Sequence, residues 1–360
     1  MTGSSHPVGG GRMTVRGMPA YDRGPLYRRA TSWMKFMARA APSLALQDGK
    51  PFLVAVSNPP LNAQLALALS RTRGMPYGLL IWDIYPDALV RLGWLRQNSP
   101  VVRAWRRFNA MAMLEARVVV TLGERMRRVL AEQVGSAADR VRWEVIPNWV
   151  DTSVFRPREG HENPFACEQG WIDGTTVLYS GNIGAGHGVE MLPAAARLLS
   201  ENRDIRFAVV GDGLGRPALE REVAVRNPPR FTLHPYQPWD RVPEVVATGN
   251  IAVVFQRPGF EDLAMPSKTY SALASGSAIL AVTSDNSDLA ALVRDHDVGI
   301  VVSANPTAIS EGLKQLVTNP RALQKMRCRA RAVAVAHFDT QVIRRRWETV
   351  LSPLIHGSHG

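Results

Sequence analysis

Short apolar segments alternate with amphipathic ones along most of the chain. Apolar, β-branched runs recur from FLVAVS (52–57) to GIVVS (299–303), and most are followed by a loop and by apolar positions at helical spacing. Runs that are apolar throughout are typical of strands buried on both faces of a parallel sheet. The pattern therefore predicts an α/β protein in which strand, loop and helix repeat.

The alternation is interrupted at PNWVDTSVFRPREGHENPF (147–165), whose prolines, asparagines and charges indicate a linker. We therefore expect two Rossmann-like domains, over 26–150 and 151–335. Residues 1–25 are rich in glycine and proline without periodicity and predict an irregular leader. Residues 336–360 are expected to form a helix and tail that returns to the first domain.

The composition, 46% hydrophobic and 21% charged over 360 residues, is that of an ordinary globular protein. The net charge of +12 is located in the first 150 residues, which hold 21 Lys and Arg against 9 Asp and Glu, whereas the remainder holds 22 of each. A basic domain attracts acidic lipid, phosphorylated substrates or nucleic acid, although a general solubility bias gives the same numbers. No nucleic-acid-binding motif occurs in the sequence, so nucleic acid is not an expected partner.

Two segments of the first domain interleave Arg and Lys with aromatic residues and methionine, YRRATSWMKFMARAA (27–41) and VVRAWRRFNAMAM (101–113). This spacing is typical of helices that lie in an anionic membrane interface, and helices packed with one solvated face fit it equally. The apolar runs are too short to span a membrane. Two cysteines without metal-ligand spacing indicate a reducing compartment. We therefore expect a cytoplasmic protein, peripheral at the inner membrane face.

Ligands of open parallel sheets bind in the loops that follow the strands. GNIGAGHG (181–188) lies between a strand and a helix, where glycines permit close backbone approach and a helix start favours an anion. A tight turn has the same composition. GDGLG (211–215) also follows a strand, and its Asp212 suits a helix cap equally well.

The stretch GFEDLAMPSKTYSALASG (259–276) is more specific. Pro266 suits a helix entrance. The amides that begin at Ser267, together with the charge of Lys268, predict an anion site that a phosphate would fill. A capped helix with a surface lysine would not account for Glu261 in the preceding loop.

Two strand-end loops of the first domain carry polar groups, SNPP (57–60) and WDIYPD (82–87). Asp83 and Asp87 at the end of a central strand suit the orientation of a hydroxyl or assistance to proton transfer. An Asx-type turn explains the same residues.

These motifs, in this order, resemble the family 4 retaining glycosyltransferases of GT-B architecture, in particular bacterial members that build surface polysaccharides or glycolipids. The resemblance runs from about Tyr27 to the carboxyl terminus. It implies a nucleotide-sugar donor, UDP-linked, on the second domain and a glycan or lipid-linked acceptor on the first. It also implies that no metal or other cofactor is required, because helix amides and cations stabilise the leaving diphosphate.

The resemblance assigns roles to individual residues. The catalytic positions would be Asp83, Glu261 and Lys268, with Glu261 on sugar hydroxyls. The donor-binding positions would be Gly181, Asn182, Gly184, His187, Gly211, Gly213, Tyr236, Gln237, Pro266, Ser267, Lys268 and Ser271. The acceptor-side positions would be Ser57, Asn58, Asp83 and Asp87.

The sequence departs from the family pattern in three respects. Ser271 stands where many members carry a ribose-binding Glu, and the loop before His187 lacks the frequent arginine. The βαβ unit that usually precedes the region matching Tyr27 is not found, so we expect an incomplete amino-terminal domain.

Three other functions are considered. One is a glycosyltransferase that acts on a soluble small molecule, and another is a catalytically impaired nucleotide-binding paralogue. A sugar-nucleotide epimerase of the same fold is disfavoured, because the expected acid and base clusters do not occur.

Overall fold

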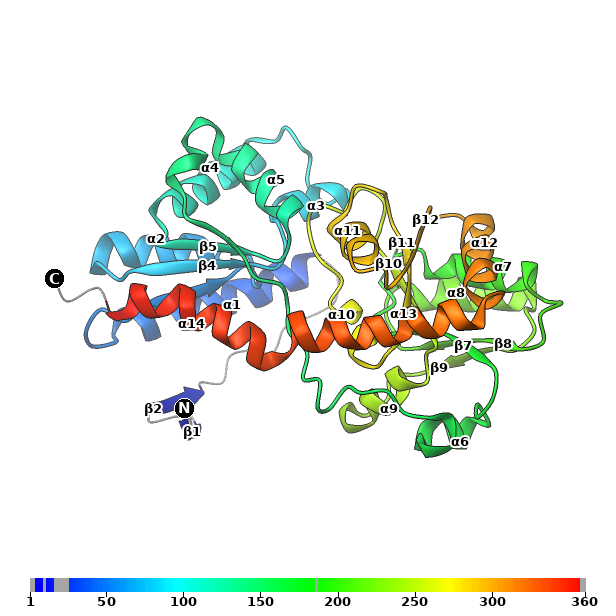
Figure 1. The fold of residues 1–360 in the computed structure, drawn as a ribbon. Coiled ribbons are helices and arrows are strands. Elements are labelled where there is room, and N and C mark those ends of the chain that lie inside the picture. Colours follow the sequence, from blue (N-terminus) through cyan, green and yellow to red (C-terminus); the bar gives the residue numbers. More distant parts are fainter. Residues whose placement is uncertain (1–3, 9–10, 16–25, 185–186, 357–360) are drawn as a thin grey trace. The chain divides into compact units, whose positions relative to one another are not determined.

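The computed structural model describes residues 4–8, 11–15, 26–184 and 187–356 (Figure 1). The chain forms two compact units, one of Met1–Thr121 with Leu130–Glu144 and the other of Leu122–Val129 with Val145–Gly360. The division at residue 145 lies close to the linker that the sequence predicts.

The first unit contains a four-stranded sheet in the order β3-β4-β5-β6. β3 pairs with β4 and β4 with β5 in parallel, with Leu53 opposite Tyr77 and Gly78 opposite Val118. β4 and β5 are buried along their whole length, as their apolar sequences predict. The strands are β3 (Leu53–Val56), β4 (Tyr77–Ile81), β5 (Val118–Thr121) and β6 (Trp143–Val145).

Helices cover both faces of this sheet, with α4 on one side and α1 on the other (Figure 1). The Tyr77 hydroxyl donates to the carbonyl of Ala112 at 2.7 Å and fixes α4 to the central strand. Ser99 caps α4 by accepting from the amide of Val102. The helices are α1 (Leu26–Ala45), α2 (Asn62–Arg73), α3 (Asp87–Arg91), α4 (Pro100–Glu115), α5 (Glu124–Val134) and η1 (Gly135–Arg140).

A hairpin precedes these elements. β1 (Ser4–Val8) and β2 (Gly11–Val15) pair antiparallel, with Val8 opposite Gly11. The expectation of an irregular leader was wrong for these residues. Two glycines separate the strands in the sequence, a spacing typical of hairpins that the high glycine content obscured. The other residues of the leader, 1–3, 9–10 and 16–25, lie outside the described part of the chain.

The second unit contains a six-stranded parallel sheet in the order β12-β11-β10-β7-β8-β9. β10 and β11 are buried throughout. The last strand, β12, lies within the predicted run GIVVS (299–303). The strands are β7 (Thr175–Ser180), β8 (Ile205–Val210), β9 (Phe231–His234), β10 (Ile251–Phe255), β11 (Ala278–Val282) and β12 (Gly299–Val302).

Two apolar layers enclose this sheet. The larger joins alternate strand residues such as Val253 and Leu280 to α7, α8 and α12, and the smaller joins Leu178 and Val210 to Phe165. Five helices of this unit are α6 (Pro164–Gln169), α7 (Leu192–Leu198), α8 (Arg216–Arg226), α9 (Val242–Ala247) and α12 (Pro306–Val317). The others are α10 (Lys268–Ala274), α11 (Asp288–Asp295), α13 (Pro320–Val333) and α14 (Thr340–His356), with short helices η2 (Gly160–Glu162), η3 (Val189–Met191), η4 (Trp239–Arg241) and η5 (Ala334–Phe338).

The start of the second unit is fixed to its carboxyl-terminal segment. Thr152 donates its hydroxyl to Asp339 at 2.6 Å, and Arg331 donates to the carbonyls of Thr152, Phe155 and Ala274. The expected carboxyl-terminal helix is α14, which groups with the second unit. Its return to the first domain stays a prediction. Along the described residues, no helix is both long and apolar enough to cross a membrane.

Candidate functional site

Two glycine-containing loops pack against each other beyond the ends of β7 and β8. The amide of Gly181 donates to Val210 at 2.9 Å and that of Ile183 to Asp212 at 2.8 Å. A Cβ on Gly211 would lie 1.9 Å from the Gly181 carbonyl oxygen, and one on Gly213 would lie 2.4 Å from that of Ile183. Close packing of the two loops therefore accounts for both glycines without a ligand.

His187 occupies the end of the first loop. Its Nδ1 accepts from the amide of Gly184 at 3.2 Å, so that amide is engaged inside the protein. Burial and the nearby charge of Lys268 hold the pKa of His187 below its usual value, which keeps the ring neutral. The structure thus brings Gly184 and His187 together, with the histidine on the Gly184 amide.

Lys268, the cation of the predicted anion site, lies beside the first glycine loop. It begins α10, and its Nζ lies 3.6 Å from the place a Cβ would take on Gly181. The same Nζ lies 3.6 Å from the centroid of the Tyr179 ring. Burial lowers the pKa of Lys268 to about 7. An anion placed here would favour the charged form.

The start of α10 offers fewer amides than predicted. The amide of Thr269 donates to the carbonyl of Pro266 at 3.2 Å. Ser267 is exposed at the helix start and makes no side-chain capping bond. Ser271 turns its hydroxyl back to the carbonyl of Lys268 at 3.0 Å.

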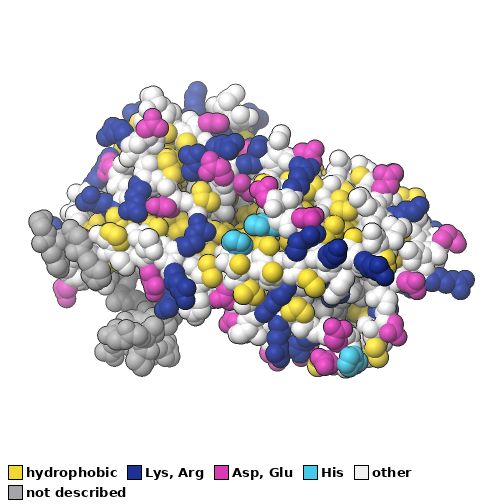
Figure 2. Space-filling view, viewed as in Figure 1, with side chains coloured by type: hydrophobic (Ala, Val, Ile, Leu, Met, Phe, Trp, Pro, Cys, Tyr) yellow, Lys and Arg dark blue, Asp and Glu magenta, His cyan; other side chains and the backbone are white. Residues whose placement is uncertain are grey.

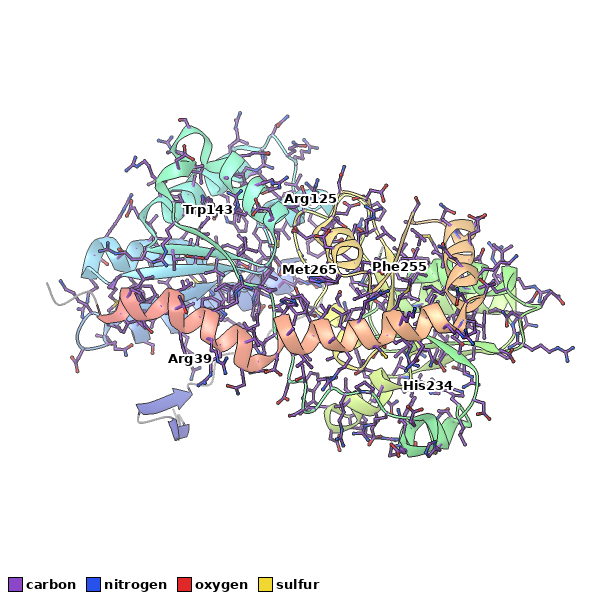
Figure 3. The ribbon with its side chains drawn as sticks, viewed as in Figure 1. Arg39, Arg125, Trp143, His234, Phe255 and Met265 are labelled. Carbon is purple, nitrogen blue, oxygen red and sulfur yellow. The ribbon has the colours of Figure 1, made fainter. Side chains whose placement is uncertain are left out.

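The loop before α10 carries Glu261, which is half-buried. Its carbonyl accepts from Nε2 of Gln256 at 3.3 Å. Gln256 follows Phe255, which packs against Tyr179 at 6.1 Å between ring centroids (Figure 3). Tyr179 and Gln256 were not among the predicted residues. A glutamine that ends the apolar run IAVVFQ was the available signal for the second.

The turn after β9 reaches the first glycine loop through Tyr236. Its hydroxyl donates to Oδ1 of Asn182 at 3.4 Å, and Tyr179 donates to the carbonyl of the same Asn182 at 2.7 Å. Gln237 instead bonds locally to the carbonyl of Pro235. His234, which ends β9 (Figure 3), accepts from the amide of Gly211 at 3.0 Å. Tyr236 therefore joins the predicted donor residues, whereas Gln237 shows no contact to them.

The first unit holds a separate pocket at the ends of β3 and β4. Ser57 and Asp83 line it together with apolar side chains that include Leu61, Ile81 and Trp105. The Ser57 hydroxyl accepts from the amides of Trp82 at 2.9 Å and Asp83 at 3.1 Å, which ties the two strand-end loops. Burial raises the pKa of Asp83 to about 6.

Two predicted acceptor-side residues do not line this pocket. Asp87 pairs with Arg106 at 2.7 Å and accepts from Gln133 at 3.0 Å, so both of its oxygens serve the structure. Asn58 is not among the lining residues. Gln64 and Asn109 line the pocket instead, and Nε2 of Gln64 donates to Oδ1 of Asn109 at 2.5 Å. Both lie on helices, so the pattern of strand-end loops did not indicate them.

Two parallel-sheet units, the second with a lysine beside a glycine loop after a central strand, define a two-domain α/β protein whose ligand sites are expected at the ends of the strands. Residues 174–319 match the family described as Glycosyl transferases group 1. The second unit therefore contains a region that matches a group 1 glycosyl transferase domain.

Curated relatives carry glycosyltransferase names. The chain is 25% identical over 243 residues to the probable glycosyltransferase WbjE of Pseudomonas aeruginosa, which covers 68% of this chain and 60% of that protein. It is 27% identical over 261 residues to the putative colanic acid biosynthesis glycosyl transferase WcaI of Escherichia coli K12, which covers 70% and 63%. It is 25% identical to the alpha-D-kanosaminyltransferase of Streptomyces kanamyceticus over 68% and 61%. The matches thus span about three fifths of each relative.

Solved structures share the fold at low identity. Sucrose-phosphate synthase of Thermosynechococcus elongatus superposes with a TM-score of 0.76 at 15% identity, over 98% of this chain and 86% of that one. HepE of Anabaena, in complex with UDP, gives 0.72 at 14% identity over 90% and 84%. These likenesses show the fold, which is that of GT-B glycosyltransferases.

Proposed function

We propose that this protein is a retaining glycosyltransferase that moves a sugar from a UDP-linked donor to a glycan or lipid-linked acceptor. The observation that carries the proposal is the half-buried Lys268 beside Gly181, within the region that matches a group 1 domain. HepE structures in complex with UDP and with UDP-glucose support the donor class. The names of WbjE and WcaI support the acceptor class.

In this proposal the donor lies in the second unit. Lys268 neutralises charge on the diphosphate with Ser267 beside it, so no metal ion is needed for that step. Glu261 holds hydroxyls of the sugar. The acceptor oxygen attacks the anomeric carbon from the face that the diphosphate leaves, the bond from that carbon to the phosphate oxygen breaks, and the departing phosphate takes the acceptor proton.

The acceptor lies against the first unit in the pocket lined by Ser57 and Asp83. The Asp83 carboxyl is the acidic group that lines this pocket, and it orients the acceptor hydroxyl. The apolar side chains around it exclude water from the reacting group. Asp87 has no part in this step, because Arg106 and Gln133 occupy its carboxylate.

The enzyme works at the cytoplasmic face of the membrane, where lipid-linked acceptors are presented. α1 exposes Tyr27 and Met34, at 66% and 62%, beside the exposed cations Arg28, Lys35 and Arg39. Exposed apolar and basic side chains on one helix favour an anionic membrane surface. In the view of Figure 2, cations are interspersed with acidic side chains over the rest of the visible surface.

Nucleotide binding tests the donor site directly. Thermal unfolding would be followed with UDP, GDP, UDP-glucose and other nucleotide sugars. At about a hundredfold excess over Kd, a ligand stabilises by about 2.7 kcal/mol. We expect such a shift with uridine ligands, its loss in Lys268→Ala, and its retention in Lys314→Ala, which changes an exposed lysine of α12. Failure of every nucleotide to shift the wild type would refute the donor site.

A soluble acceptor is the second candidate, favoured by the likeness to the kanosaminyltransferase. Radiolabelled donor would be offered with extracted lipid-linked glycans or with soluble small-molecule acceptors. Label in the lipid phase supports the first assignment, and label in the soluble fraction supports the second. Nucleotide binding without label transfer to either would indicate an impaired paralogue.

A further inference from the structure

A glutamine directly follows the apolar strand β10. Gln256 is only 6% exposed, and its backbone amide continues the sheet by donating to the carbonyl of Val282 at 3.0 Å. Its side-chain amide is therefore enclosed in the second unit. A buried amide needs partners for two donor hydrogens and for its oxygen.

The loop that carries Glu261 takes both donor hydrogens. Nε2 of Gln256 donates to the carbonyl of Glu261 at 3.3 Å and to that of Ala264 at 2.8 Å. Leu263, between these two residues, is 1% exposed. One side chain therefore holds both ends of the 261–264 turn, while the apolar residue inside it packs into the unit.

The oxygen of the same amide is held from the neighbouring strand. Thr283, directly after β11, donates its hydroxyl to Oε1 of Gln256 at 2.9 Å. The Thr283 hydroxyl also lies 3.0 Å from that of Ser287, which accepts from the amide of Ala290 and caps α11. All three polar side chains are at most 6% exposed. Gln256 is thus oriented before it holds the loop.

We propose that Gln256 is a positioning residue for Glu261, and that Thr283 fixes the glutamine in the required orientation. This inference rests on the proposed function, in which Glu261 holds hydroxyls of the donor sugar. The amide reaches the loop at Glu261 and Ala264 and makes no bond to Lys268. Loss of the amide should therefore weaken recognition of the sugar and spare recognition of the nucleoside diphosphate.

The test compares three variants. Gln256→Met keeps the side-chain length without its hydrogen bonds, Thr283→Val removes the donor to Oε1, and Thr283→Ser retains it. Hydrogen exchange of the 258–265 segment should accelerate in the first two and not in the third. The same two should bind UDP-glucose about three- to tenfold more weakly, as expected for a lost hydrogen bond, while UDP binding stays within about twofold of the wild type.

A double-mutant cycle decides whether the effect passes through Glu261. If it does, Gln256→Met adds no further loss of UDP-glucose affinity to Glu261→Gln. Additive losses, unchanged exchange of the segment, or equal weakening of UDP would each overturn the inference. A wild type that binds neither UDP nor UDP-glucose would refute the proposed function and the inference with it. A wild type that binds both, with Gln256→Met unchanged, would refute the inference alone.

Discussion

The ammonium of Lys268 lies 3.6 Å from the centroid of the Tyr179 ring, and Tyr179 is 1% exposed. Burial disfavours the charged form of the lysine, whereas the face of an aromatic ring favours it. The Tyr179 hydroxyl donates to the carbonyl of Asn182 at 2.7 Å, so the ring is fixed to the first glycine loop. The Tyr179 ring therefore holds the Lys268 ammonium beside Gly181.

Nucleotide binding should be linked to protonation of Lys268. Its pKa is lowered to about 7 from an ordinary value of 10.5. Between these values the unfolded chain binds a proton that the free folded protein lacks, so this group's contribution to stability rises with pH. A bound diphosphate restores the charge, so at about pH 8 binding should take up close to one proton.

Calorimetry in buffers of different ionisation enthalpy measures this uptake. Affinity for UDP should fall as the pH rises above about 7, by up to about tenfold per unit. Lys268→Met should bind UDP weakly and abolish the uptake. If proton uptake persists in this variant, another group takes up the proton. The neutral His187 of the first glycine loop would then be the candidate.

Tyr179 should separate affinity from stability. Tyr179→Phe keeps the ring under Lys268 and loses only the bond to Asn182, which costs about 1 kcal/mol of unfolding free energy. Tyr179→Leu removes the ring and should weaken UDP binding by about 1–2 kcal/mol beyond the Phe variant. Isothermal titration and urea unfolding on both variants make the comparison. Equal affinities of the two would show that the ring does not act on the lysine.

Local pattern was sufficient to predict the sheets. IAVVF and AILAV form β10 and β11 because a strand buried on both faces must be apolar at every position. It was also sufficient to group Gly181 with Lys268, since both follow parallel strands. The first-domain loops were paired for the same reason, and the Ser57 hydroxyl joins them.

Individual roles could not be predicted from these patterns, because they depend on partners distant in sequence. The sequence suggested Asp87 as an acceptor-side residue. In the structure its carboxylate pairs with Arg106, which lies on another helix. The sequence suggested Gly211 as a donor-binding glycine. In the structure the Gly181 carbonyl packs against it, which by itself requires a glycine. Nothing in the sequence distinguishes Tyr179 from other strand residues. Its role becomes visible only because Lys268 lies over its ring in the structure.

Gly211 and Gly259 form a matched pair for testing loop packing. Both have positive φ, 153° and 81°, so alanine strains the backbone at either site. A Cβ at 211 would also meet the Gly181 carbonyl at 1.9 Å, whereas at 259 nothing lies within 4 Å. Gly259→Ala should cost about 1–2 kcal/mol, and Gly211→Ala about 3 kcal/mol or more with loss of UDP binding. Equal unfolding free energies in urea would contradict the loop contact.

Charge reversal on α1 should weaken binding to anionic vesicles. Arg28, Lys35 and Arg39 are exposed, and Arg39 is labelled in Figure 3. A basic side chain near an anionic surface contributes about 1 kcal/mol, so the triple Glu variant should lose about a hundredfold or more in co-sedimentation affinity. Retention of the wild type should also fall as salt is added, because added ions screen these charges.

The control carries the same charge change on the second unit. Its three substituted positions are Arg221, Lys314 and Lys325, all exposed. This variant should sediment with the vesicles like the wild type. Equal loss in both variants would indicate a response to net charge alone, and no loss in either would remove the membrane role of α1.

Asp83→Asn should raise stability and slow transfer. The pKa of Asp83 is raised to about 6 from an ordinary 3.8. The folded state therefore holds its proton more tightly, and the stability due to Asp83 is full below about pH 4 and lost as the pH rises through about 6. At about pH 7.5 the uncharged asparagine should add about 1–3 kcal/mol to the unfolding free energy, and about half of that at pH 5.

Transfer by the same variant should fall about a hundredfold while UDP binding is unchanged, because the carboxylate acts only on the acceptor. Asp87→Asn is the matched control. It breaks the ion pair between Asp87 and Arg106. In that pair the Arg106 side chain is 28% exposed and the Asp87 side chain 14%. It should therefore lower stability by about 1–3 kcal/mol and leave transfer per folded molecule intact. A stabilised Asp83→Asn protein that still transfers sugar at the wild-type rate would leave Asp83 as a buried acid without a part in the reaction.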